Sequence, residues 1–182
     1  ALSELAESIE QHGVLQPLVV RPLANGSYQL VAGERRWRAA RIAGLTEVPV
    51  VIKDLTDEEV IEIAMIENLQ REDLNPLEEA LGYRYMMDEL KITQEQAAEK
   101  VGKSRPAVAN ALRLLKLPNE VQEMVKNNLI SPGHARALLG FDSDDMILQT
   151  AKMIIKEDLS VREVETLVKK SKKVQKSSKK QT

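Results

Sequence analysis

The stretch that decides the fold of the second half is "ITQEQAAEKVGKSRPAVANALRLLKLP", from Ile92 to Pro118. Within it, Ala98, Gly102 and Val108 are spaced four and six residues apart. A small residue lets two helices cross closely, a glycine adopts the left-handed turn, and a branched apolar residue buries the second helix. The spacing therefore predicts a helix-turn-helix, whose remaining inward positions are Ala97, Val101, Ala111, Leu112 and Leu115.

The outward face of the second predicted helix carries side chains that reach base edges or phosphates in a major groove. These are Ser104, Arg105, Ala107, Asn110 and Arg113. Downstream, "SPGHARALLG" predicts another helix with a capping serine and a proline at its first position. Its positive end would place three further residues near a phosphate, namely Gly133, His134 and Arg136. His134 fits a capping role equally well, and an ordinary helical hairpin is the alternative for the whole motif.

The first part of the chain alternates helix and strand. Helices are predicted over Leu2–His12, over Glu34–Ala43 and from the Thr56 capping box to Leu69, and strands over Gln16–Pro22, Tyr28–Ala32 and Val48–Ile52. After "REDLNP" the strand signals end and only helical patterns follow. We therefore predict an α+β chain: a small α/β domain over residues 1–72, an all-α domain over 73–168 and a lysine-rich linker or tail over 169–182.

Composition excludes several classes of function. The chain has no cysteine, which excludes disulfides, thiolate metal sites and thiol nucleophiles, and only two histidines. The aromatic content of 3% favours a helical, aliphatic core. No apolar run approaches about 20 residues, so we expect no membrane span and a cytoplasmic protein.

The net charge of −2 is unevenly distributed. The last 14 residues, Lys169–Thr182, hold seven lysines and no acidic residue, so the rest of the chain carries 19 basic and 28 acidic residues, a net charge of −9. The tail is interpreted either as a solvated linker or as a segment attracted to polyanions.

A second basic cluster lies in "VAGERRWRAARIAG", from Val31 to Gly44. The pattern places Gly33, Glu34, Arg35 and Arg36 at the start of a helix that follows a strand. Free backbone N–H groups and the helix dipole favour an anion at such a position. The alternative is a solvated basic helix face with Trp37 packed inward.

A third cluster, "ENLQRED", closes the helix that ends near Leu69. Glu67 and Asn68 are hard oxygen donors of the kind that bind Mg²⁺ together with phosphate oxygens and water. Arg71 adds a cation for phosphates. Together with the second cluster this suggests a nucleotide site without a Walker loop, although helix caps and ion pairs would give the same residues.

Four ordered motifs, "SIEQHGVLQPLVVRP", "VAGERRWRAARIAG", "ENLQREDLNPLEEA" and "GKSRPAVANALRLLKLP", resemble the ParB family of bacterial partition proteins to about residue 168. The chromosomal branch is closer than the nucleoid-occlusion branch. The resemblance implies a helix-turn-helix domain that binds centromere-like parS DNA in the nucleoid. It also implies an N-terminal domain that binds CTP with Mg²⁺ and hydrolyses it slowly. CTP would switch a homodimer, through closure of its N-terminal gate, into a clamp that slides along DNA.

Carried over motif by motif, the resemblance assigns the cytosine side of the pocket to Val14, Leu15 and Gln16. It assigns the phosphates to Gly33, Glu34, Arg35 and Arg36, Mg²⁺ to Glu67 and Asn68, the triphosphate also to Arg71, and hydrolysis to Glu34 and Glu67. It further implies that the segment recruiting a ParA-type ATPase and the C-terminal dimerisation domain are absent from the sequence.

Three other readings compete with this one. A plain helix-turn-helix regulator would leave the α/β half without a nucleotide. ParB-type α/β domains also resemble sulfiredoxin, which the absence of cysteine excludes, and small-molecule kinases, which need no helix-turn-helix. RNA binding would require stacking aromatics, and the aromatic residues here are few and scattered.

Overall fold

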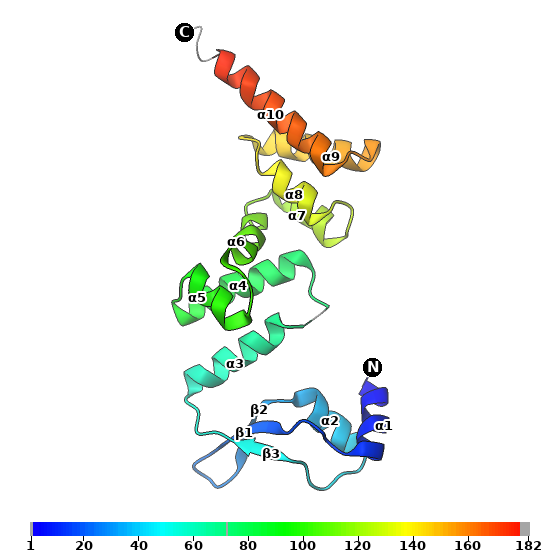
Figure 1. Ribbon diagram of the computed structural model, residues 1–182, viewed down its shortest axis with the longest axis vertical. Coiled ribbons are helices and arrows are strands. Elements are labelled where there is room, and N and C mark those ends of the chain that lie inside the picture. Colours follow the sequence, from blue (N-terminus) through cyan, green and yellow to red (C-terminus); the bar gives the residue numbers. More distant parts are fainter. Residues whose placement is uncertain (1, 72, 179–182) are drawn as a thin grey trace. The chain divides into compact units, whose positions relative to one another are not determined.

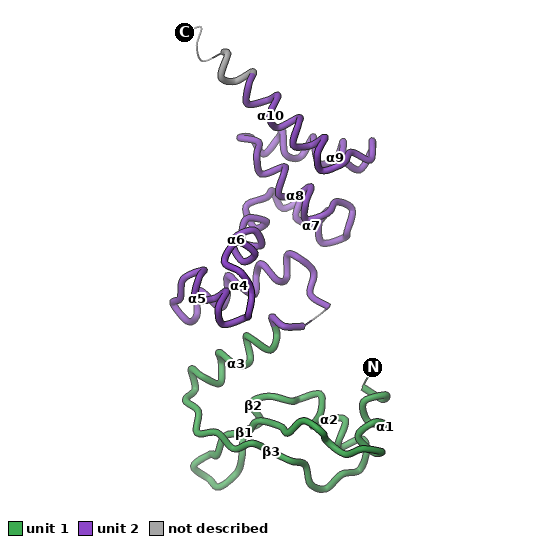
Figure 2. Tube along the Cα trace, in the orientation of Figure 1, with its two compact units in different colours: residues 1–68 green, residues 69–182 purple. Residues whose placement is uncertain are grey.

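The computed structural model describes residues 2–71 and 73–178, and it divides into two units, Ala1–Asn68 and Leu69–Thr182 (Figure 2). Helices and strands alternate in the first unit, as α1 (Leu2–His12), β1 (Leu18–Pro22), β2 (Tyr28–Ala32), α2 (Glu34–Ile42), β3 (Val50–Ile52) and α3 (Asp57–Leu69). In its described part the second unit is helical, with α4 (Pro76–Leu90), α5 (Gln94–Val101), α6 (Arg105–Leu114), α7 (Asn119–Lys126), α8 (Pro132–Leu138), α9 (Asp144–Glu157) and α10 (Val161–Ser178) (Figure 1).

The sheet of the first unit has the strand order β2-β1-β3. β1 and β2 pair antiparallel through a turn at Gly26, whose φ of 82° is in the left-handed region. β1 and β3 pair in parallel. The chain reverses direction between β1 and β2, and α2 then carries it back so that β3 runs in the same direction as β1. β1 is therefore the central strand, and its Leu18 and Val20 are buried.

α1 and α2 pack on each other and bury a small cluster of Ala6, Ile9, Ala39 and Ala40. The alanines allow the two helices to approach closely, so this cluster is well packed although three of its four buried residues are small. α2 also contacts β1. The start of α2, at Gly33, lies against Leu18, the first residue of the central strand.

The start of α3 is tied to the sheet by Arg21 of β1. Its guanidinium donates to Gln29 Oε1 at 2.7 Å, to the Leu55 carbonyl at 3.1 Å and to Asp57 Oδ1 at 2.6 Å. The capping box predicted at Thr56 is present: Glu59 accepts from the Thr56 N–H and the Thr56 hydroxyl accepts from the Glu59 N–H.

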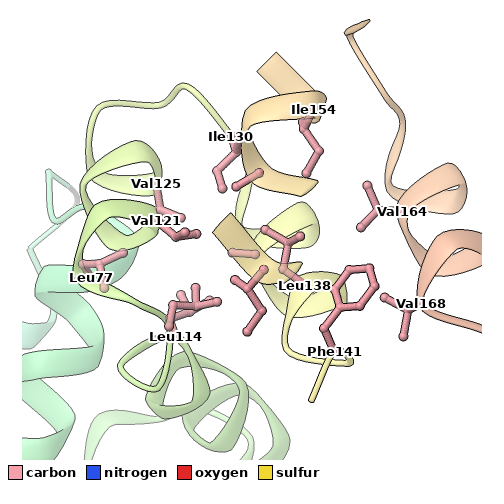
Figure 3. Packing of buried hydrophobic residues seen from close by; sticks show 14 residues of the cluster. Leu77, Leu114, Val121, Val125, Ile130, Leu138, Phe141, Ile154, Val164 and Val168 are labelled. Atoms are coloured by element: carbon pink, nitrogen blue, oxygen red, sulfur yellow. The ribbon is translucent and has the colours of Figure 1, made fainter. Parts of the chain in front are cut away.

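The core of the second unit is a continuous apolar cluster formed by residues of α4 and α6 to α10 and of the loops between them. Figure 3 shows side chains from these segments converging, among them Leu138, which is fully buried, and Phe141 and Val164 on the side of α10. Leu114, at the end of α6, belongs to this same cluster. The helix-turn-helix is therefore anchored in the main core and is not a separate appendage.

The predicted helix-turn-helix consists of α5 and α6. Gly102 ends α5 in the left-handed conformation with φ 68°, and the Ser104 side chain caps α6. Ala98 and Val108 are buried as the spacing predicts, and α4 packs across α6.

The predicted fold class is confirmed: a small mixed sheet with helices followed by a helical domain. The first and third strands begin two residues later than predicted, at Leu18 and Val50. The lysine-rich segment expected to be a linker continues α10 as helix to Ser178, because lysine is a good helix former; residues 179–182 lie outside the described residues. Among the described helices, none is long and apolar enough to cross a membrane.

Candidate nucleic-acid interface and anion site

α6 presents its first turn and outer face to solvent. Arg105, Ala107 and Arg113 are exposed, and Asn110 is half-buried. The Ser104 hydroxyl accepts from the Ala107 N–H at 3.3 Å, so this residue caps the helix as well as facing outward. The helix thus offers short polar and basic side chains beside its positive end, as a major-groove reading helix does.

One concave surface adjoins α6, with a volume of about 500 Å³. We call it the recognition groove, and it brings together residues of α4, α6, α8 and the turn between α5 and α6. Its lining residues are Pro76, Glu79, Lys103, Ser104, Pro106, Ala107, Asn110, Ala111, Leu114, Pro132 and Arg136. Four residues expected to contact DNA therefore share it, namely Ser104, Ala107, Asn110 and Arg136. The structure thus joins the two sequence clusters that were predicted separately.

The His134 side chain is half-buried, and both of its ring nitrogens have partners within the protein. Its Nδ1 accepts from the Ser131 N–H at 3.3 Å, and its Nε2 lies 2.9 Å from the Leu159 carbonyl. Because that carbonyl only accepts, Nε2 carries the proton. At Gly133 an added Cβ would lie 3.1 Å from Val161 Cγ2, so the glycine permits close packing against the start of α10. Both residues fix α8 in place, and Arg136 is the exposed member of this cluster.

Arg113 lies on the other side of α6. It lines a second concave surface of about 400 Å³ together with Arg84 and Met87 of α4, Leu112 and Lys116. Arg84 and Lys116 are basic residues that the sequence patterns do not single out. They place positive charge next to the predicted reading helix, and Asp88 in the same lining offsets part of it.

The predicted anion site at the start of α2 depends on Gly33. Gly33 occupies the N-cap position with φ 102° and ψ 24°, and no side chain caps the helix. The N–H groups of the first turn therefore have no intrahelical acceptor and point outward. A Cβ at Gly33 would lie 2.7 Å from Leu18 Cδ2, so only glycine allows the chain to turn here against the buried strand.

Arg36 joins this helix start to the segment before β1. Its Nη1 donates to the Gln16 carbonyl at 2.8 Å and to the Pro17 carbonyl at 2.9 Å. The same guanidinium lies about 3.4 Å from where a Cβ of Gly33 would be. Gln16, Gly33 and Arg36, which were assigned to one nucleotide site, therefore do meet.

The other residues predicted for the nucleotide site differ in how exposed they are and in what they contact. Arg35 is exposed, Leu15 is 83% exposed, and Val14 packs on the cluster between α1 and α2. The Glu34 carboxylate accepts from Arg38 Nε at 2.7 Å in an exposed ion pair. Trp37 does not pack inward as the alternative reading expected: it is 37% exposed, with the Arg41 guanidinium 5.2 Å from its ring centre.

Glu67 and Asn68 lie in the last turn of α3, where both are exposed. Among the described elements, α3 does not pack extensively against α2. Neighbouring residues on a helix point about 100° apart, so the two side chains do not form a ready chelate. Within the described residues, no group of three or more acidic, histidine or cysteine side chains could hold a metal.

Arg71 belongs to the second unit and pairs with Asp73 in a two-pronged contact, Nε to Oδ1 at 3.0 Å and Nη2 to Oδ2 at 2.7 Å. This hydrogen bonding, followed by the charge of Asp73, raises the pKa of the Arg71 guanidinium. The pair is fully exposed, so solvent screens it.

Replacing Gly33 by Ala should destabilise the first unit. The left-handed backbone costs an alanine about 1 kcal/mol, and the approach to Leu18 adds about 1–3 kcal/mol of overpacking. Gly26→Ala is the matched control, because Gly26 has φ 82° but open space around a Cβ. Trp37 is the single tryptophan and lies in this unit, so urea unfolding followed by its fluorescence reports the change. Equal losses in both variants would show that the contact with Leu18 does not matter.

Two sequence families match the chain, the ParB N-terminal domain over residues 1–69 and the ParB HTH domain over residues 72–173. The chromosome-partitioning protein ParB of Myxococcus xanthus is 53% identical over 170 residues, which are 93% of this chain and 57% of that protein. The chromosome-partitioning protein Spo0J of Thermus thermophilus is 56% identical over 167 residues, 92% of this chain and 61% of that protein. The chain thus spans about three fifths of these relatives.

A solved structure extends the comparison to three dimensions. The C-terminally truncated chromosome-partitioning protein ParB of Caulobacter crescentus, complexed to the centromeric parS site, is 48% identical and has a TM-score of 0.83 to this chain. The match covers 93% of this chain and 87% of that one. By its two matched domains, in order and over nearly its whole length, this chain belongs to the ParB family.

Proposed function

We propose that this chain is the DNA-binding and nucleotide-binding part of a ParB-type chromosome-partition protein, and that its second unit binds parS-like double-stranded DNA. The observation that carries the proposal is the recognition groove, in which α6 and α8 bring predicted DNA-contacting residues to one surface. The match to the Caulobacter crescentus protein complexed to parS supports it, because it extends over both units.

In this proposal α6 enters the major groove. Ser104, Ala107 and Asn110 approach base edges, and the basic side chains of Arg105, Arg113 and Arg136 neutralise phosphates on either side. Gly133 and His134 act indirectly, because they hold α8 against residues 159–161. The chain is acidic overall, so DNA binding relies on the local placement of basic residues and should weaken steeply with salt.

We infer that the first unit binds CTP, with the triphosphate at the start of α2. Three features support an anion there: the uncapped N–H groups after Gly33, the left-handed glycine that lets a ligand approach the backbone, and the Arg36 guanidinium. Arg35 is exposed and free to reach a phosphate. Gln16 lies beside Arg36, so Val14, Leu15 and Gln16 would meet the base end of a nucleotide; the choice of cytosine comes from the family resemblance.

Mg²⁺ would be held chiefly by phosphate oxygens and water, with Glu67 or Asn68 as protein ligand, since Mg²⁺ needs only one or two such groups. When bound, the ion would neutralise charge on the phosphates. In this proposal the end of α3 lies near the start of α2 when a nucleotide is bound, as a nucleotide-driven switch would require. Glu34 and Glu67 remain the proposed positioning groups for hydrolysis, and slow turnover fits the lack of a buried, activated base among the described residues.

The full proposed activity is that of a homodimer whose N-terminal gate closes on CTP and which then slides on DNA in the nucleoid. A ParA-type ATPase would be a further partner of the whole protein. A nucleoid-occlusion relative would share every part of this account except the cellular role. A helix-turn-helix regulator without nucleotide would share only the DNA contacts.

Arg105→Ala tests the DNA contact. We expect the affinity for the parS duplex bound by the Caulobacter crescentus relative to fall about tenfold or more, since a hydrogen bond to a charged group such as a phosphate contributes about 1.5–3 kcal/mol. CTP affinity should be unchanged. Arg162→Ala, which removes an exposed positive charge from α10, is the control. Fluorescence anisotropy on a labelled duplex measures the DNA affinity of both variants. Unchanged parS binding in Arg105→Ala would contradict the proposal that α6 enters the major groove.

Arg36→Ala tests the nucleotide site. We expect CTP affinity to fall about tenfold or more, because a hydrogen bond to a charged group contributes about 1.5–3 kcal/mol. DNA binding without nucleotide should persist. Arg41→Ala removes an exposed charge from the same helix and should change CTP affinity by less than about threefold. Isothermal titration calorimetry measures the CTP affinity of both variants. Equal losses of CTP affinity in the two would show that the start of α2 does not bind the nucleotide.

A further inference from the structure

The recognition groove contains an unexpected negative charge. Glu79 of α4 is the acidic side chain among its described lining residues, whereas Lys103 and Arg136 are basic. A carboxylate beside DNA phosphates is unfavourable unless it has a partner, since like charges repel. Its presence in a surface that otherwise suits DNA therefore requires an explanation.

Glu79 is held in a fixed orientation by Tyr83, one helical turn further along α4. The Tyr83 hydroxyl donates to Glu79 Oε1 at 2.6 Å, and Tyr83 is 1% exposed. Burial, and then the hydrogen bond and charge of Glu79, raise the pKa of the Tyr83 hydroxyl. The hydroxyl therefore stays protonated at neutral pH and always donates, which occupies one carboxylate oxygen and fixes where the other one lies.

Glu79 is not needed to cap its helix. Asn75 and Glu78 form the capping box of α4, in which Glu78 accepts from the Asn75 N–H at 2.9 Å. In the part of the chain that the structure describes, the contact recorded for the Glu79 carboxylate is the one with Tyr83. The remaining oxygen is thus an oriented hydrogen-bond acceptor in the groove.

When DNA occupies the groove this oxygen loses water, which costs free energy unless a donor replaces it. In a major groove the donors are the exocyclic amines of cytosine (N4) and adenine (N6), whereas guanine and thymine present acceptors at the corresponding edge. We propose that Glu79 is a specificity-determining residue: its free carboxylate oxygen accepts a hydrogen bond from the exocyclic amine of a cytosine or adenine and disfavours DNA without one there.

This inference rests on the proposed DNA binding of the second unit, and it goes further because it names the base chemistry selected by α4, a helix outside the helix-turn-helix. An acceptor that rejects wrong sequences contributes specificity rather than affinity. Its removal should therefore strengthen binding to unrelated DNA, which is the opposite of what removal of a DNA-contacting residue normally does.

Glu79→Gln is the decisive variant, because glutamine keeps the acceptor for Tyr83, removes the charge and adds a donor. Affinities of the 182-residue chain are measured by fluorescence anisotropy for the parS duplex and for a scrambled duplex of equal length and composition. We expect binding to scrambled DNA to tighten and the ratio of the two affinities to fall about tenfold. Single base-pair changes in parS should locate one cytosine or adenine whose replacement weakens wild-type binding about tenfold and weakens Glu79→Gln much less.

Glu89→Gln is the matched control, since Glu89 is an exposed carboxylate in the last turn of the same helix. It should tighten binding to both duplexes equally and leave the ratio unchanged. If wild type discriminates between the duplexes and Glu79→Gln discriminates equally well, with an unchanged melting temperature, the role of Glu79 is refuted while the proposed function stands. If wild type binds both duplexes equally, the proposed function fails and this inference fails with it.

Discussion

The left-handed backbone at Gly33 is the constraint on which the first unit depends. It lets the chain leave β2, pass within van der Waals distance of the buried Leu18 and start α2 without a capping side chain. An uncapped helix start is costly unless water or a ligand satisfies its N–H groups. The Arg36 guanidinium beside it adds positive charge, so the geometry that makes the turn also suits the proposed anion site.

Several helices of the second unit start differently from α2, although α7 and α9 have no side-chain cap and α3 of the first unit has one. α4, α5, α6 and α8 all begin with a side-chain cap from Asn75, Thr93, Ser104 or Ser131. One first-turn N–H group or more of each is satisfied by the cap, so the proposed DNA recognition relies on side chains that line a shared groove. The uncapped start of α2 and the capped start of α6 fit the proposed division of labour, in which phosphates of a small ligand bind to backbone in the first unit and DNA binds to side chains in the second.

Local sequence rules predicted the elements where the chemistry is local. The capping box at Thr56 and the left-handed turn at Gly102 follow from neighbours within six residues, and both are present. The same rules missed what depends on distant packing. The link from Arg36 to the carbonyls before β1 spans about twenty residues, and the place of Glu79 in the recognition groove requires α4 to lie across α6.

Other differences have equally physical origins. Its composition predicts that the lysine-rich segment is a linker, yet the segment continues α10. Lysine is a good helix former, and adding residues to a helix that has already formed is easier than starting a new one. Glu67 and Asn68 are adjacent in the sequence, which suggests a pair of metal ligands. In the helix their side chains point about 100° apart, so they do not form a ready chelate. A switch that moves α3 would reconcile their predicted role with their observed position.

The proposed coupling of a CTP site to a parS site in one chain is tested most directly by phosphate release. Turnover of CTP, ATP, GTP and UTP should be compared with Mg²⁺, with and without a palindromic parS duplex. The account predicts turnover that is selective for CTP and stimulated by the duplex. Absence of turnover together with absence of CTP binding at equilibrium would contradict it, and would leave a DNA-binding chain whose first unit has another purpose.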